Sequence, residues 1–230
     1  NSIENYSGDW QILVRNQEET CQNVGILTPE TPDYQDVFMG ALNGVFQHTH
    51  SEELFLMARD TLLETKQGGC NEGFLRPEAM LHIIMISDEP EQSPGYFANY
   101  IQHIVEIKGS TDLLRFSAIA QPYPNSTCGW PGLGYWQVVQ QNDGVFLDIC
   151  SDWSADENLG LLAEESVVRT NFTLEQQAVE GTVQVWINEN PTIEGWNYDT
   201  SNNAVQFENG IIQAGDRIRV TYGQSTLCDH

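Results

Sequence analysis

The chain has 230 residues and a formal net charge of −24 at pH 7, because 33 residues are acidic and only 9 are basic. Such a charge repels phosphate backbones and anionic membranes, which excludes nucleic acid as a main partner, whereas it attracts divalent cations and basic surfaces. A hydrophobic content of 40% indicates a folded protein, and no apolar stretch is long enough to span a membrane.

From the N-terminus, the first 168 residues alternate predicted strands and helices. Short apolar runs predict the strands, and apolar residues at helical spacing predict the helices. Ser51 and Ser93 are expected N-caps. The expected elements are a strand at 10–14, helices beginning at 33 and spanning 51–65, a strand at 81–86, a helix from 94 to 108, a strand at 113–120, a short helix around 135–139, a strand at 145–149 and a helix at 156–163. This order is typical of a doubly wound α/β domain with a mostly parallel sheet.

The most informative segment is the apolar run Leu81–Ile86, which stops at Ser87-Asp88-Glu89. A run this short is typical of a strand buried on both faces, as in a parallel sheet covered by helices. Ligands collect outside the carboxyl ends of such strands. Asp88 is therefore a candidate site residue, with a solvated strand end as the alternative. His82, inside the run, is expected to be a hydrogen-bonded core histidine.

After about residue 169 the pattern changes to alternation of apolar and polar residues. Thr182–Ile187 and Arg217–Tyr222 alternate in this way, and Trp196–Asp199 and Ala204–Phe207 flank a turn sequence typical of a hairpin. The chain is therefore predicted to have two parts, an α/β domain at 1–168 and a small antiparallel β module at 169–230.

Five cysteines lie far apart with no CxxC pair, which favours structural disulfides in an oxidising compartment over a zinc or redox motif. Many pairings are open to five cysteines. We prefer Cys21–Cys70 and Cys128–Cys150, which leaves Cys228 for a partner outside this sequence, either a missing N-terminal segment or a second chain.

Several segments together carry a resemblance to a known family. They are Asp9–Val14 followed by Cys21, Cys70–Arg76 (CNEGFLR), Ser87–Ser93 (SDEPEQS) and Ile149–Trp153 (ICSDW), with weaker pieces at Gly195–Asp199 and Ala214–Tyr222. On these segments the first 165 or so residues resemble a von Willebrand factor A domain, as found in exported bacterial proteins, often lipoproteins, in which a short β module follows. The resemblance implies a doubly wound sheet whose usual first strand is absent from this chain, so we expect a mature product or a fragment.

The resemblance also implies a metal-ion-dependent adhesion site on three loops at one end of the sheet. Asp88 matches the aspartate of the third loop, and Thr49 is the preferred hydroxyl ligand of the second, with Ser51 in reserve. The Asp-x-Ser-x-Ser motif of the first loop is absent, so Mg²⁺ or Ca²⁺ would find only part of its oxygen ligands here. Ligand contacts are expected from Glu89, His50 and Trp130.

We therefore expect a binding protein rather than an enzyme, secreted, periplasmic or at the cell surface. It would recognise a protein or glycan ligand through the loops around Asp88 and Thr49, with a ligand carboxylate completing the coordination of the cation. The alternative is a structural subunit of an extracellular assembly that needs no metal and makes contacts through sheet edges or the β module. An acid-dependent hydrolase is the third hypothesis, although no nucleophile–base pair has a known spacing.

Overall fold

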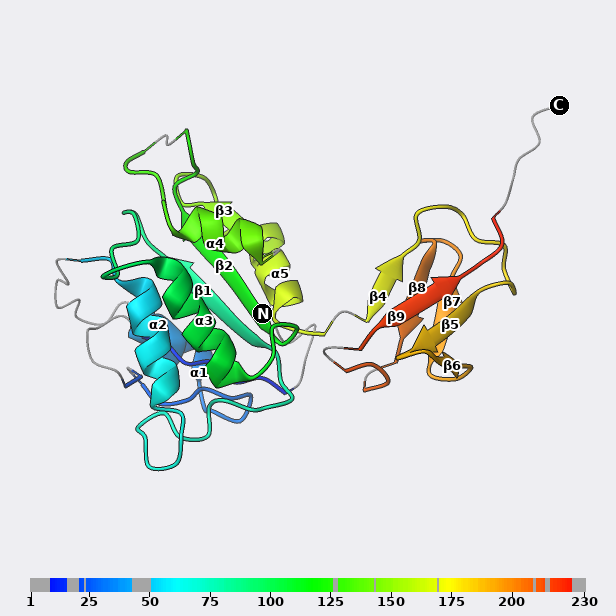
Figure 1. Cartoon of the computed structure of the whole chain (residues 1–230), viewed down its shortest axis with the longest axis horizontal. Helices are drawn as coiled ribbons and strands as arrows, with labels where there is room; N and C mark the ends of the chain where they lie inside the picture. The colour runs from blue at the N-terminus through cyan, green and yellow to red at the C-terminus, as the bar shows by residue number, and fades with distance from the viewer. Residues whose placement is uncertain are drawn as a thin grey trace. The chain divides into compact units, whose positions relative to one another are not determined.

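A computed structural model describes residues 9–15, 21–22, 24–42, 51–125, 128–142, 144–168, 170–208, 210–213 and 216–224. The chain divides into two compact units, Asn1–Val167 and Val168–His230 (Figure 1). The sequence had placed the boundary between 168 and 169. Within the described ranges, no helix combines the length and the apolar character that crossing a membrane requires.

The first unit is built on a three-stranded parallel sheet in the order β1-β2-β3. Parallel pairing follows from the connections, because a helix returns the chain to the start of each next strand. The predicted helices and strands between 33 and 163 are present, β1 with its predicted bounds and the others with shifted ends. They are α1 (Tyr34–Leu42), α2 (Leu54–Leu63), β1 (Leu81–Ile86), α3 (Phe97–Lys108), β2 (Leu114–Ala120), α4 (Tyr135–Gln141), β3 (Phe146–Asp148) and α5 (Asp156–Glu165).

Helices pack on both faces of this sheet. On one face lie α2, α3 and α4 (Figure 1). Their apolar side chains, among them Phe55 of α2, form a core cluster with Phe116 of β2. On the other face, Leu162 of α5 packs on Ile119 of β2. Phe116 and Ile119 face opposite ways because side chains alternate along a strand. The sheet is thus the middle layer of three.

β1 is not buried on both faces, contrary to the expectation from its apolar sequence. It is an edge strand among the described residues, and Ile84 and Ile86 are 42% and 44% exposed. Leu81 and Met85, on the face covered by α2 and α3, are buried. An unbroken apolar run carries no periodicity, so it cannot distinguish a central strand from an edge strand.

His82 is hydrogen-bonded at both ring nitrogens, as predicted, although its side chain is half-buried rather than in the core. The Val145 N–H donates to Ser117 Oγ (3.0 Å), whose own proton is then available for His82 Nε2 (2.7 Å). Ser166 donates to Leu162 O (2.9 Å), so its oxygen accepts from His82 Nδ1–H (2.7 Å). These bonds select the neutral Nδ1–H tautomer and link β1 to β2 and to α5. Burial lowers the pKa of His82, a hydrogen bond to the Leu162 carbonyl opposes this effect, and the charge of Arg115 adds to it, so that the pKa is about 4.

The predicted strand at 10–14 is reduced to a single antiparallel bridge between Ile12 and Leu27. Its segment is held on α2 instead, because the Arg15 guanidinium donates to Met57 O and Thr61 Oγ1. One bridging pair is too short to form a strand, so the side chain of Arg15, rather than backbone pairing, attaches this segment to the first unit.

Both preferred disulfides are present. Cys21 and Cys70 have their Cα atoms 5.6 Å apart, and Cys128 and Cys150 have theirs 5.8 Å apart. The first bridge joins the N-terminal segment to the loop after α2, and the second joins the loops that follow β2 and β3. Cys228 lies outside the described residues.

The second unit contains two three-stranded antiparallel sheets, β4-β8-β7 and β6-β5-β9. Its own core gathers Val185, Val205, Phe207 and Ile212. The hairpin strands have the predicted bounds, whereas β4 and β6 were missed because each has three residues and β6 contains a proline. The strands are β4 (Asn171–Thr173), β5 (Gln184–Ile187), β6 (Asn190–Thr192), β7 (Trp196–Asp199), β8 (Ala204–Phe207) and β9 (Ile218–Thr221).

Replacing both cysteines of a bridge by serine should destabilise the first unit, and the loss should be greater for the bridge that closes the longer loop. The separations are 49 residues for Cys21–Cys70 and 22 for Cys128–Cys150, so we expect losses of about 4 and about 3 kcal/mol in the chain-entropy model. Urea unfolding followed by tryptophan fluorescence measures both. A larger loss for the Cys128–Cys150 pair would contradict this ordering.

The His82 ring should stay neutral down to pH about 4, with its proton on Nδ1. A depressed histidine pKa stabilises the folded state above the unfolded value of about 6.5, and this contribution is lost as the pH falls through the folded pKa. Nitrogen-15 NMR of the imidazole ring measures both the tautomer and the titration. A proton on Nε2, or titration near 6.5, would refute the hydrogen-bond chain through Ser117 and Ser166.

Candidate functional site

Three segments of the first unit meet at the carboxyl end of β1. They are the residues that lead into α2, the loop 87–96 after β1 and the loop 121–134 after β2. The Gln92 N–H donates to Glu52 O (2.8 Å), which joins the loop after β1 to the start of α2. The Glu91 N–H donates to Leu133 O (2.9 Å), which joins the same loop to the segment before α4. The meeting point lies where ligands bind in open α/β sheets.

The loop after β1 caps the N-terminus of α2. The Phe55 N–H donates to Glu91 Oε1 (3.2 Å) and the Leu56 N–H donates to Ser93 Oγ (3.0 Å). The Ser93 N–H and hydroxyl both donate to the Glu91 carboxylate. These side chains satisfy helix N–H groups that have no intrahelical partner, and the carboxylate charge suits the positive end of the helix. The loop is therefore held by the helix that it caps.

The two predicted N-cap serines have other roles. Ser93 does not cap α3, whose N-cap is Tyr96 with no side-chain hydrogen bond. Ser51 does not cap α2, whose N-cap is Glu53; the Ser51 hydroxyl instead donates to Glu53 Oε1 (2.9 Å). Cap preferences describe a residue next to its own helix, so they cannot find a cap supplied by a distant loop.

Glu52 lies beside the loop in a partly buried position. The Ser87 hydroxyl lies 3.1 Å from Glu52 Oε2 and 3.0 Å from Glu89 O. Burial raises the pKa of Glu52 above its usual 4.5, the Ser87 hydrogen bond lowers it, and repulsion by Asp88 and Glu89 raises it again. The Tyr135 hydroxyl donates to Glu52 O (3.2 Å), and burial raises the pKa of this phenol as well. Negative charge is thus concentrated at this edge of the sheet.

Glu91 belongs to the same group of acids. Burial raises its pKa, while hydrogen bonds from Ser93 and Phe55 lower it. Its position also requires glycine at 134, where φ is +93° and an added Cβ would lie 2.6 Å from Glu91 Cβ. The loop before α4 therefore packs against the Glu91 side chain at a distance that only glycine permits.

The structure describes some of the predicted site residues at this edge, but not all of them. Asp88 and Glu89 are exposed at the carboxyl end of β1, next to Glu52. Trp130 is 70% exposed on the loop after β2. Ser51 is half-buried before α2, whereas Thr49 and His50 lie outside the described residues.

The described donors do not form a complete metal centre. Across the parts of the chain that the structure describes, no group of three or more His, Cys, Asp or Glu side chains could hold a metal ion. Ser51 is already bonded to Glu53, and a magnesium ion requires six oxygens in near-octahedral array. Because Thr49 is not among the described residues, binding of Mg²⁺ or Ca²⁺ at Asp88 stays a prediction.

Sequence reasoning missed the contacts that Glu52, Glu91 and Tyr135 make at this edge. Glu91 bonds a backbone group 36 positions away, and Tyr135 bonds one 83 positions away. Neither contact leaves a local pattern in the sequence. The one available signal was the density of acids in Ser87–Ser93, directly after an apolar run.

No protein-family model matches the chain, and comparison with curated proteins and with solved structures gives no match. The resemblance to an A domain therefore stays a prediction that rests on the sequence segments themselves.

The variant Glu52→Gln should unfold at a higher temperature than the unmodified protein at pH 7. The folded pKa of Glu52 is raised above 4.5, so its ionised form costs stability above that folded pKa, and the cost disappears below the unfolded pKa. The difference should therefore shrink as the pH is lowered to about 4. Thermal unfolding followed by circular dichroism measures it.

Glu106→Gln is the matched control, because it removes one charge from an exposed position on α3. Equal stabilisation by both variants at pH 7 would show that net charge, rather than the surroundings of Glu52, causes the effect.

Proposed function

We propose that this protein is a secreted, periplasmic or cell-surface interaction module that binds a protein or glycan ligand through the carboxyl edge of its parallel sheet. In this proposal the first unit is a doubly wound domain of the von Willebrand factor A type, and the second is its β appendage. The protein acts by binding, without catalytic turnover.

The observation that carries the proposal is the convergence of three segments at the carboxyl end of β1. Asp88 and Glu89 are exposed there, while Glu91 and Ser93 anchor their loop to α2. Because the loop is anchored, its backbone loses little conformational freedom when the exposed side chains bind a ligand, which favours recognition. The Cys128–Cys150 bridge further restrains two neighbouring loops.

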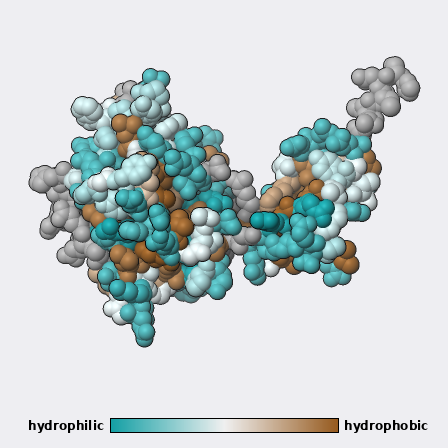
Figure 2. All heavy atoms as spheres, viewed as in Figure 1, coloured by the Kyte–Doolittle hydropathy of each residue, from teal (hydrophilic) through white to brown (hydrophobic). Residues whose placement is uncertain are grey.

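Two features support an oxidising compartment outside the cytoplasm. Both disulfides join segments of the first unit, as structural bridges of exported proteins do. Hydrophilic residues also occupy much of the visible surface of each unit (Figure 2), and a formal charge of −24 favours solubility.

A divalent cation completes the proposal. Asp88 would be a direct or water-bridged ligand, and Thr49 or Ser51 would supply a hydroxyl oxygen. When bound, Mg²⁺ or Ca²⁺ would offer an open position to a carboxylate of the ligand. Glu89, His50 and Trp130 would then contact the ligand around the ion.

Titration calorimetry with Ca²⁺ and Mg²⁺ tests the metal directly. We expect a dissociation constant of about 10⁻⁴ to 10⁻³ M, the range of weak extracellular calcium sites, and its loss in Asp88→Ala. Asp112→Ala is the matched control, because Asp112 is an exposed aspartate that precedes β2 at the opposite end of the sheet.

Equal binding by the unmodified protein and Asp88→Ala would remove the metal site from the proposal. Sedimentation that finds regular polymers, unchanged by chelator and by Asp88→Ala, would favour the structural subunit. The exposed edge of β1 is the observation that makes this second function worth testing.

A further inference from the structure

The outer edge of β1 carries unpaired backbone groups. Among the described residues, β1 pairs only with β2. The Leu81 N–H donates to Leu113 O (2.8 Å), so the odd-numbered residues of β1 bond toward β2. Bonding direction alternates along a strand, which turns the N–H and C=O groups of His82, Ile84 and Ile86 to the outer edge.

Among the described residues, this edge has none of the protection that its own sequence could give it. Native edge strands are blunted by charges, prolines, bulges or short length, whereas β1 is six residues long with the sequence LHIIMI. Ile84 and Ile86 add apolar side chains that are 42% and 44% exposed. The opposite edge of the sheet is different, because β3 has three residues and ends in Asp148. Within the described part of the chain, the sheet is therefore open on the side of β1.

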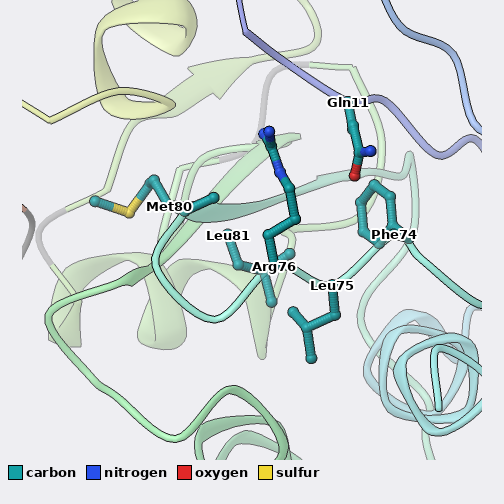
Figure 3. Close-up of a pocket in the computed structure, with 7 residues that line it drawn as sticks. Gln11, Phe74, Leu75, Arg76, Met80 and Leu81 are labelled. Carbon is teal, nitrogen blue, oxygen red and sulfur yellow. The ribbon is translucent and has the colours of Figure 1, made fainter. Parts of the chain in front are cut away.

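A cavity lies at the amino end of the same strand. It has about 30 Å³, enough for a single water molecule, and Gln11 lines it together with Met80 and Leu81 (Figure 3). Gln11 Oε1 is buried, and it has no hydrogen-bond partner in the described structure. A buried acceptor without a partner costs roughly 1–3 kcal/mol. A water molecule in the cavity, or an incoming N–H group, would remove that cost.

Charge favours a basic partner over a second copy of this chain at the outer edge of β1. Asp88 and Glu89 are exposed at the carboxyl end of β1, and both raise the pKa of Glu52 by repulsion. A second copy would bring the same acids and a further charge of −24 to the interface, which opposes association. A basic partner would neutralise these acids instead.

We propose that the outer edge of β1 binds an extended strand of a partner polypeptide. The strand has apolar residues at alternate positions, which cover Ile84 and Ile86, and basic residues at the end that lies beside Asp88 and Glu89. Its backbone bonds the outward groups of β1, as in other cases of strand addition to an open edge. This surface adjoins the loop of the proposed function at Asp88 and Glu89, but most of it is the edge of β1 itself, and it does not require a metal.

The test uses the full chain and a seven-residue peptide of alternating valine and threonine that ends in two lysines. On binding, hydrogen exchange resolved by NMR should slow at the amides of His82, Ile84 and Ile86. The amides of Ile83 and Met85 already bond β2, so their exchange should not change. The same peptide with N-methyl groups at alternate residues should bind at least about tenfold more weakly, because its donors are removed.

Ile84→Lys should also weaken the peptide by at least about tenfold, because it removes an apolar contact and places a cation near the lysines. Ile193→Lys is the matched control, since it makes the same change at a residue of the second unit that is 86% exposed. Three results would overturn the proposal: protection away from β1, binding unaffected by N-methylation and by Ile84→Lys, or a dimer of the chain that Ile84→Lys dissociates. The exchange measurement needs no variant, so it decides the question even if Ile84→Lys does not fold.

Discussion

The structure of the first unit depends on the parallel pairing of β1 with β2, in register from Leu81 opposite Leu114 to Ile86 opposite Ile119. Because the two strands are parallel, their carboxyl ends lie at the same edge of the sheet, where the loops that follow them meet the start of α2. It brings His82 between Ser117 and Ser166, where both ring nitrogens are bonded. It also leaves the other side of β1 unpaired within the described structure. The candidate site and the open edge are therefore two consequences of one strand position.

The carboxyl edge is organised by polar contacts more than by apolar packing. Glu91 and Ser93 supply hydrogen bonds that the first turn of α2 cannot make for itself, and Ser87 holds the Glu52 carboxylate. Burying carboxylates beside one another is unfavourable, and the raised pKa values of Glu52 and Glu91 express that cost. Cations lower such a cost, whether as divalent ions or as basic side chains. The acids at this edge therefore favour the same partners as the net charge of −24, which are divalent cations and basic surfaces.

Much of the fold could be predicted from local patterns. The bounds of β1 and of the hairpin strands β7 and β8 were predicted without error, because each is an apolar or alternating run between turn residues. Both disulfides were also anticipated. The failures concern contacts between distant segments. Ser93 looked like the cap of its own helix but caps α2, and the strand expected at 10–14 forms only one bridge, because its neighbours in space decide whether a ladder exists.

The sequence by itself determined most of the secondary structure, the division into an α/β part and a β part, and the acidity of the segment after β1. These properties follow from hydrophobic periodicity, turn residues and composition, which are local or additive. Only the tertiary structure decided that β1 lies at an edge with Ile84 and Ile86 exposed, and that Glu91 caps α2. The sequence of an apolar strand does not depend on whether it pairs with one neighbouring strand or with two. The sequence around a carboxylate does not indicate that a distant backbone N–H will bond to it. Such properties belong to the packing of segments, which no window of sequence contains.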